Sequence, residues 1–287
     1  MLAVTQLAPK DAGDFPVFKM GADGLACFID AVNQDIAREE TLRPRIAVYR
    51  EGKNFTPQLQ ITQDKGWFRP FVQSVLSQGI SVVVNDIGLT RPACMAVEAA
   101  TGVTVDWVMQ QNLYVTPPEV QGFSPHCDVH MVVVAQLYGR KEWVIYDKVA
   151  DNPVFTQGGT EVLFPEKGEV PAIHKRFVVG PGDIFVIPRG VFHDACARGE
   201  CSVHIAIGCA GIRPIDCIWA LAGEAVNDSN LRADMTPEDA AAAAKAFLAS
   251  RPVPLAQLPR NPQAVVPAPK GPQTLSFEES LRAVPRH

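Results

Sequence analysis

The chain has 287 residues, of which 47% are hydrophobic and 20% charged, and its net charge is -5. This composition supports a sizeable hydrophobic core in one large domain, alone or with a smaller appendage. The mild acidity argues against a broad nucleic-acid-binding surface, because such surfaces are basic. Seven cysteines without a CxxC pair disfavour a disulfide framework and a zinc knuckle, and they indicate free thiols in a reducing cytosol.

Neither a secretory signal nor a membrane segment is expected from the sequence. The N-terminal residues lack a charged segment followed by an apolar one. No apolar run is long enough to cross a bilayer. We therefore expect a cytoplasmic protein without membrane or nucleic-acid partners.

The sequence before residue 104 predicts an alternation of helices and strands. Apolar residues recur at helical spacing, and glycines stand where the pattern ends. We expect the segment 1–103 to pack these elements against a central core. The predicted helices cover residues 22–42, 66–79 and 91–102, and the predicted strands cover residues 45–52 and 80–87.

A different pattern begins at residue 104. Short apolar runs rich in β-branched residues are separated by Gly and Pro turns, which is typical of an all-β barrel or sandwich. We expect this β-core to occupy residues 104–212, with a turn after Gly139 between two of its strands. The predicted strands cover residues 103–116, 130–139, 142–147, 175–180, 183–188 and 202–208.

The pattern becomes helical again after the β-core. Helices are predicted within residues 213–250, and Thr236 stands where it can cap the last of them. Residues 251–287 form a proline-rich tail, and its part 251–272 is expected to be extended or mobile.

Potential metal ligands stand at alternate positions just before the apolar run 131–137. His126, Asp128 and His130 point the same way if this segment is extended, because successive strand residues face opposite sides. A further ligand could come from His193, which follows a short predicted strand and a turn. Two histidines and one carboxylate form the facial triad that binds non-haem Fe(II), although manganese, nickel or zinc could occupy the same set. A hydrogen-bonded His/Asp pair at a strand end is the structural alternative.

Several stretches of the sequence resemble the cupin-fold, JmjC-type 2-oxoglutarate oxygenases, and in particular their ribosomal-oxygenase-like branch. They are NLYVTP at 112–117, GFSPHCDVHMVVVAQLYGRKEWVIYD at 122–147, GDIFVIPRGVFHDA at 182–195 and SVHIAIG at 202–208. Weaker resemblance extends over most of residues 20–240. The resemblance implies a mixed α+β fold with a double-stranded β-helix, or jelly-roll, core, preceded by helices and followed by a helical segment.

The resemblance also implies roles for individual residues. His126, Asp128 and His193 would bind the iron at the catalytic centre. Lys141 falls where this family places the basic residue for the distal carboxylate of 2-oxoglutarate, and an ammonium group offers that carboxylate a charge and donors. The other implied cosubstrate-pocket residues are Asn112, Tyr114, Thr116 and His204. Ala206 departs from the family pattern, because relatives often carry a hydroxyl residue there.

The implied activity is Fe(II)-dependent hydroxylation of a C–H bond, with 2-oxoglutarate and O2 as cosubstrates. Three hypotheses remain open: a protein or peptide substrate, a free amino acid or natural-product metabolite, and a metal-binding cupin that does not activate oxygen. Residues 213–250 resemble the start of a dimerisation segment, so a homodimer is expected. The insertion at 150–175 is expected to form the wall over the metal, since loops on a rigid barrel often set specificity.

Overall fold

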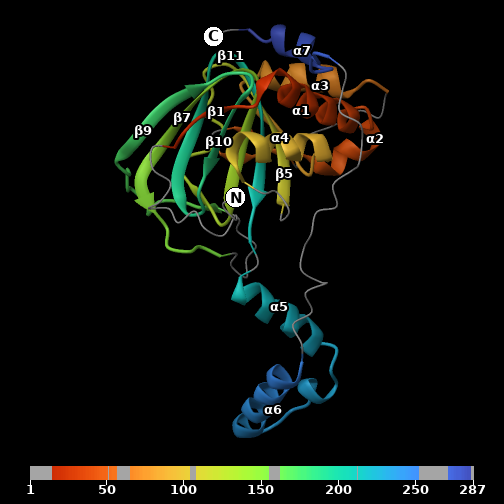
Figure 1. The fold of residues 1–287 in the computed structure, drawn as a ribbon, viewed down its shortest axis with the longest axis vertical. Helices are drawn as coiled ribbons and strands as arrows, with labels where there is room; N and C mark the ends of the chain where they lie inside the picture. Colours follow the sequence, from red (N-terminus) through yellow and green to blue (C-terminus); the bar gives the residue numbers. More distant parts are fainter. Residues whose placement is uncertain are drawn as a thin grey trace. The chain divides into compact units, whose positions relative to one another are not determined.

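The computed structural model describes residues 15–50, 52–56, 65–103, 108–154, 162–211, 213–251 and 271–285. The chain divides into two compact units, Met1–Ala210 with Asn261–His287, and Gly211–Arg260. The first unit holds the β-core with helices along one side of it, and the second holds α5 and α6 (Figure 1). Among the described residues, no helix combines the length and apolar composition of a membrane span.

Most predicted elements are present, with shifted ends. The helices are α1 (Gly21–Ile36), α2 (Glu39–Leu42), α3 (Phe68–Leu76), α4 (Arg91–Thr101), α5 (Pro214–Ala225), α6 (Pro237–Ser250) and α7 (Glu278–Arg282). The strands are β1 (Phe18–Lys19), β2 (Ile46–Arg50), β3 (Lys53–Asn54), β4 (Ser81–Val84), β5 (Val108–Thr116), β6 (Cys127–Asp128), β7 (Met131–Val149), β8 (Val162–Leu163), β9 (Ile173–Val179), β10 (Asp183–Ile187) and β11 (Val191–Cys209). Thr236 caps α6 as predicted, because its hydroxyl accepts a hydrogen bond from the backbone N–H of Asp239 at 3.2 Å.

A nine-stranded antiparallel sheet forms the core, in the order β1-β10-β7-β11-β5-β4-β2-β3, with β9 also paired to β7. The first part of β7 pairs with β10 and its second part pairs with β9, while β11 follows β7 through both parts. These two long strands therefore bend and fold the sheet onto itself. The predicted mixed α+β fold with a double-stranded β-helix core is confirmed.

The bend in β7 lies at Gly139, where the sequence had predicted a turn between separate strands. That prediction is wrong, because pairing with β11 continues past the glycine, through Arg140 and Lys141. Gly139 has a φ of 63°, and a Cβ there would lie 1.8 Å from the carbonyl oxygen of Cys201. Only glycine fits both conditions without strain. The buried side chain of Gln136 braces the bend by donating a hydrogen bond to the Gly139 carbonyl at 3.1 Å.

Alternation along the long strands divides their side chains between two layers. Val133 of β7, Ile205 of β11 and Leu113 of β5 share a core with the helices, whereas Val132 and Val134 belong to a second core inside the folded sheet. This explains why β7 reads as an unbroken apolar run, since both of its faces are buried. On β5 the inward positions are polar, and together with residues of β11 they line a cavity.

The end of the chain differs from the expected tail at 251–287. Phe277 packs edge-on against Phe68 of α3 at 5.6 Å, and Asn33 of α1 accepts a hydrogen bond from the backbone N–H of Ser276 at 2.7 Å. The short helix α7 follows and buries Leu281. Residues 271–285 therefore belong to the first unit's core, because apolar residues resume after the prolines. Most of the part expected to be extended or mobile, residues 252–270, lies outside the described residues.

Candidate metal and cosubstrate site

Backbone pairing brings the two candidate histidine ligands together. The N–H of His126 donates to the carbonyl of His193 at 3.0 Å, and the N–H of His193 donates back to His126 at 2.7 Å. Directly paired residues project from the same face of a sheet, and Asp128 shares that face because it lies two residues farther on. The two imidazole rings are 4.6 Å apart between centroids.

The candidate ligand atoms of His126, Asp128 and His193 lie within 4.8 Å of one another. Nδ1 of His126 lies 2.8 Å from the carbonyl oxygen of Ser124, and Nδ1 of His193 lies 2.9 Å from that of Val191. Because a carbonyl only accepts hydrogen bonds, each Nδ1 carries a proton, and Nε2 is the ring nitrogen left to bind a metal. The set therefore fits a divalent metal that takes nitrogen and carboxylate ligands.

Burial keeps His193 in the form that a metal requires. Burial, and next the neighbouring His126, lower the pKa of His193 to about 4. The ring is therefore neutral near pH 7, with an unprotonated nitrogen available.

Lys141 is buried inside β7, with 3% of its surface exposed. Its Nζ donates to the hydroxyl of Thr116 at 3.0 Å and lies 3.5 Å from Nδ1 of His204. No acidic side chain of the described residues pairs with it. Burial accordingly lowers its pKa to about 7, because a buried ammonium is costly without an anion beside it.

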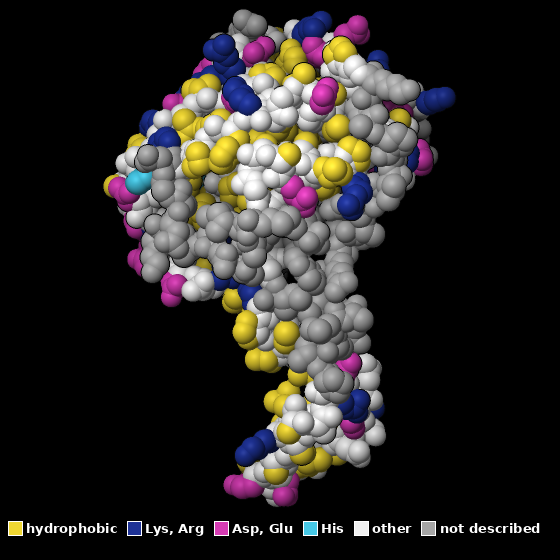
Figure 2. Space-filling model, viewed as in Figure 1, with side chains coloured by type: hydrophobic (Ala, Val, Ile, Leu, Met, Phe, Trp, Pro, Cys, Tyr) yellow, Lys and Arg dark blue, Asp and Glu magenta, His cyan; other side chains and the backbone are white. Residues whose placement is uncertain are grey.

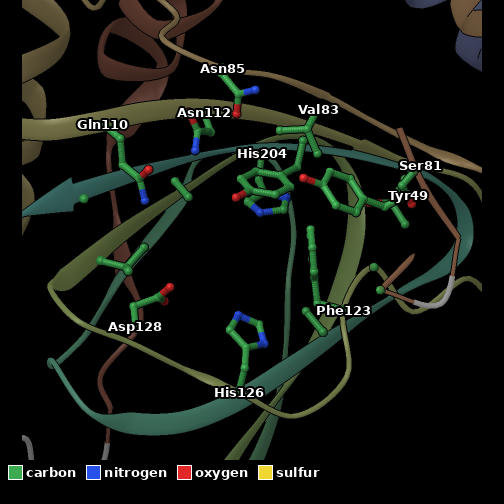
Figure 3. A pocket seen from close by; sticks show the side chains of 18 of the residues that line it. Tyr49, Ser81, Val83, Asn85, Gln110, Asn112, Phe123, His126, Asp128 and His204 are labelled. Atoms are coloured by element: carbon green, nitrogen blue, oxygen red, sulfur yellow. The ribbon is translucent and has the colours of Figure 1, made fainter. Parts of the chain in front are cut away.

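A cavity of about 730 Å³ joins the candidate metal ligands to Lys141. Figure 3 shows His126, Asp128, Asn112 and His204 around this space. All the sequence-predicted site residues line it: Asn112, Tyr114, Thr116, His126, Asp128, Lys141, His193 and His204. The structure therefore brings the whole predicted set to one place, while the role of each residue stays a prediction.

Aromatic rings form the wall near Lys141. The ring of Tyr114 stacks on His204 at 4.8 Å and an interplanar angle of 8°, and Trp143 meets His204 edge-on at 5.5 Å. Burial and the nearby Lys141 hold the pKa of His204 well below its usual value, so this ring is neutral. Asn112 is anchored by its Oδ1, which accepts a hydrogen bond from the backbone N–H of Asp86 at 3.3 Å.

Sequence reasoning missed several residues of the cavity. Trp143 lies two residues beyond Lys141 on the same face of β7, and its buried Nε1 has no partner among the described residues. Gln110 lies two residues before Asn112 on β5. The period of two along each strand could have found both residues. Tyr49 and Asn85 come from neighbouring segments, and only the folded sheet brings them to the cavity.

Other predicted positions have mixed outcomes. His130 lines the cavity and is buried at 2% exposure, but it is not part of the candidate ligand set. Ala206 lines the cavity and offers no hydroxyl, as its identity requires. From the insertion at 150–175, Phe164 reaches the cavity, while residues 155–161 lie outside the described part of the chain.

Comparison with known proteins identifies the central part of the sequence. A family model described as the JmjC domain matches residues 97–213. The chain carries a JmjC domain. It is similar to the bifunctional lysine-specific demethylase and histidyl-hydroxylase NO66 of Culex quinquefasciatus, with 27% identity over 180 residues that cover 62% of this chain and 27% of that protein. It is also similar to ribosomal oxygenase 1 of Homo sapiens, with 37% identity over 98 residues that cover 33% of this chain and 15% of that protein.

These matches confirm the predicted assignment to the ribosomal-oxygenase-like branch of JmjC-type cupins. The matched parts span about a quarter or less of these two relatives, so the similarity concerns one part of each. Among solved structures, the chain is similar to Escherichia coli ycfD, with a TM-score of 0.47 and 16% identity, covering 85% of this chain and 67% of that one. The complex of that ribosomal oxygenase with cobalt and 2-oxoglutarate gives a TM-score of 0.45 and 16% identity, covering 82% and 62%.

Proposed function

We propose that this protein is an Fe(II)- and 2-oxoglutarate-dependent oxygenase that hydroxylates a C–H bond in a protein or peptide side chain. The observation that carries the proposal is Lys141, a buried lysine without an acidic partner in the described chain, in the same cavity as a His/Asp/His ligand set. A metal-binding cupin of another chemistry has no use for this lysine. A dicarboxylate held between metal and ammonium uses both groups.

The ligand set would hold Fe(II) through Nε2 of His126, Nε2 of His193 and a carboxylate oxygen of Asp128. Three protein ligands leave further coordination positions for small molecules. Bound iron, with 2-oxoglutarate and dioxygen, supplies the oxidising chemistry and releases succinate and carbon dioxide. The chain itself holds the ligand side chains in position. The Nδ1 atoms of the two histidines donate to the carbonyls of Ser124 and Val191, and this fixes the orientation of the rings.

Lys141 would bind the distal carboxylate of 2-oxoglutarate. Thr116 accepts a hydrogen bond from Lys141, so its own hydroxyl proton is free to reach the same carboxylate. Because Ala206 supplies no hydroxyl, Lys141 and Thr116 carry this contact. The rings of Tyr114, His204 and Trp143 would exclude water around the ammonium, which strengthens its attraction for an anion.

A protein side chain is the proposed substrate. The names of the similar curated proteins describe a bifunctional lysine-specific demethylase and histidyl-hydroxylase, and a ribosomal oxygenase. The cavity also reaches the surface, since its lining includes the exposed residues Pro44 and Phe164. An open cavity of this kind admits a side chain that remains attached to a peptide.

A homodimer formed through the second unit is a further part of the proposal. Ile218, Trp219 and Val226 on and just after α5 are 52%, 43% and 67% exposed, and Leu221 is the one buried residue of that helix. Figure 2 shows hydrophobic side chains gathered on the surface of this unit. A second copy of the chain would cover this apolar surface. Light scattering at micromolar concentration should give the dimer mass, and Trp219→Glu should lower it; a monomeric wild type would contradict this part.

Turnover tests the proposed function directly. The protein, Fe(II) and 2-oxoglutarate are incubated in air with a peptide library, and succinate and peptides heavier by one oxygen atom are measured by mass spectrometry. We expect both products from the wild type and from His174→Ala, whose ring is exposed, and neither from His193→Ala. Oxidation of free amino acids in place of peptides would contradict the proposed substrate class. Bound Fe(II) without any consumption of 2-oxoglutarate would contradict the oxygenase function.

A further inference from the structure

The strand β5 places a row of residues along the cavity, at alternate positions: Gln110, Asn112, Tyr114 and Thr116. Thr116 is bonded to Lys141, so this end of the row is the proposed cosubstrate end. Gln110 lies six residues away, about 20 Å along an extended strand. A five-carbon dicarboxylate bound to Lys141 is much shorter than this. Gln110 therefore belongs to the part of the cavity that is left for the substrate.

The amide of Gln110 is held in one orientation by His130. Nδ1 of His130 lies 3.2 Å from the carbonyl oxygen of Met131, which only accepts hydrogen bonds, so Nδ1 carries the proton. In this tautomer Nε2 of the ring is the acceptor, and Nε2 of Gln110 donates to it at 2.7 Å. The other end of the amide, Oε1, consequently faces away from His130. Figure 3 shows this amide projecting into the cavity toward Asp128.

Gly208 makes room for this pair. It lies between Gln110 on β5 and Val132 on β7 in the sheet register. A Cβ at this position would lie 2.8 Å from Cγ of Gln110 and 2.8 Å from Cε1 of His130, closer than non-bonded carbon atoms pack. The missing side chain therefore allows the buried imidazole and the amide to meet.

Hydrogen bonds to the backbone likewise orient the side-chain amides of Asn85 and Asn112. Nδ2 of Asn85 donates to the carbonyl of Arg45 at 3.0 Å, which leaves its Oδ1 as an acceptor toward the cavity (Figure 3). Oδ1 of Asn112 accepts from the backbone of Asp86, which leaves its Nδ2 as a donor. This end of the cavity thus presents amide oxygens and an amide N–H in fixed positions, and none of the described residues bonds to Oε1 of Gln110.

We propose that Gln110 is a specificity-determining residue, positioned by His130, and that it selects an uncharged substrate head group carrying both an N–H and an acceptor, such as a carboxamide. This inference rests on the proposed oxygenase function. The N–H of such a group donates to Oε1 of Gln110, and its acceptor receives the N–H of Asn112, two residues along the same strand face. A guanidinium has no acceptor for Asn112, and a carboxylate has no donor for Gln110.

Two probes of equal shape test the selection. They are N-acetyl-asparaginamide and its isostere in which the side-chain NH2 is replaced by CH3. Their dissociation constants are measured anaerobically by calorimetry on the protein loaded with Fe(II) and 2-oxoglutarate. We expect the amide to bind at least about tenfold more tightly than the isostere. The preference should vanish in Gln110→Leu and persist in Gln34→Leu, an exposed control on α1. Equal binding of the probes to the wild type, or an unchanged preference in Gln110→Leu, would overturn the inference.

The positioning role of His130 has its own test. His130→Leu should lose the amide preference, and His130→Gln should restore it, because an amide oxygen then stands near the position of Nε2. A preference that survives in His130→Leu, or one that His130→Gln fails to restore, would overturn this role. The visible charge-transfer band of the Fe(II)–2-oxoglutarate complex separates two failures. A wild type without the band overturns the proposed function and this inference with it, whereas a band without amide preference overturns this inference alone.

Discussion

The two ends of the cavity are built on different chemistry. At one end, the amine of Lys141 is buried at 3% exposure, donates to Thr116 and lies beside the ring of His204. At the other end, Gln110 and Asn85 present uncharged amide oxygens held by neighbouring groups. A desolvated ammonium binds an anion strongly but distinguishes poorly between anions of different shape. Oriented amides instead select ligands by their pattern of hydrogen-bond donors and acceptors. The first end therefore suits a common cosubstrate, and the second suits a particular substrate.

Loss of a metal ligand should produce the largest effect, because the proposed reaction needs the metal for both the cosubstrate and the substrate. We expect His193→Ala to weaken Fe(II) binding by at least about 100-fold. Anaerobic calorimetry and metal content after desalting measure this directly. His174→Ala is the matched control, since that exposed ring contacts Asp147 and lies outside the cavity lining. Unchanged Fe(II) affinity in His193→Ala would contradict the assignment.

A pair of glycine substitutions compares how well the fold tolerates an added Cβ near Lys141, at the β7 bend, and near Gln110. Gly139→Ala should lower the free energy of unfolding by about 3 kcal/mol or more, because its Cβ would meet the rigid backbone at Cys201 from a positive φ. Gly208→Ala should cost less, about 1 to 2 kcal/mol, because its Cβ would meet side-chain atoms of Gln110 and His130 and not rigid backbone. Urea unfolding of both variants gives the comparison, and an equal or reversed order would contradict it.

Removal of the buried charge should affect the cosubstrate end alone. We expect Lys141→Met to weaken 2-oxoglutarate binding roughly 30- to 100-fold, the usual contribution of a charge-assisted hydrogen bond. Fe(II) affinity should stay the same. Arg140→Met is the matched control, because Arg140 is the exposed neighbour on the same strand. Calorimetry on the Fe(II)-loaded protein measures the 2-oxoglutarate affinity of both variants. Equal losses of affinity would contradict a specific role of the buried Lys141.

The pH dependence of the free energy of unfolding should show the smallest effect per pH unit. Burial lowers the pKa of Lys141 to about 7, from 10.5 for an exposed lysine. Between these values the unfolded chain binds more protons, so this group makes the folded state gain stability as pH rises, by at most about 1.4 kcal/mol per unit. The free energy of unfolding of the wild type minus that of Lys141→Met should therefore increase from pH 7 to pH 10. A constant difference in urea unfolding across this range would contradict the burial of a titrating lysine.

Binding of 2-oxoglutarate should show the opposite trend with pH. The cosubstrate needs the protonated ammonium, so its affinity should be level below pH 7 and fall by up to about tenfold per unit above it. The same titration in Lys141→Met should be flat over this range. A flat wild-type profile would show that the distal carboxylate is bound elsewhere.

Local signals in the sequence predicted much of the fold. The cap at Thr236, the helix stop at Gly102 and the β-branched runs each depend on a few neighbouring residues. The bend at Gly139 was misread as a turn, because a positive φ serves a tight turn and a sharp strand bend equally well. The packing of Phe277 was hidden by the prolines before it, since composition does not show what a later apolar residue contacts.

The candidate site also contains features that the local sequence predicts and features that only the folded sheet reveals. Alternation along an extended segment brings His126 and Asp128 together, whereas His193 had to be matched by its place after a strand and a turn. The role proposed for Lys141 came from resemblance, because its burial arises from the β7 bend and the partners on β5 and β11. The contact between Gln110 and His130 could not be foreseen, since it needs three strands in register and a glycine at residue 208.

The most direct test of the two-ended cavity is an anaerobic titration of the Fe(II)-loaded protein with 2-oxoglutarate, followed by the visible charge-transfer band. It should be run on the wild type, Lys141→Met and Gln110→Leu. We predict the band in all three, with the same half-saturating concentration for wild type and Gln110→Leu and one roughly 30- to 100-fold higher for Lys141→Met. No band in the wild type with iron bound, or equal saturation of wild type and Lys141→Met, would contradict the account.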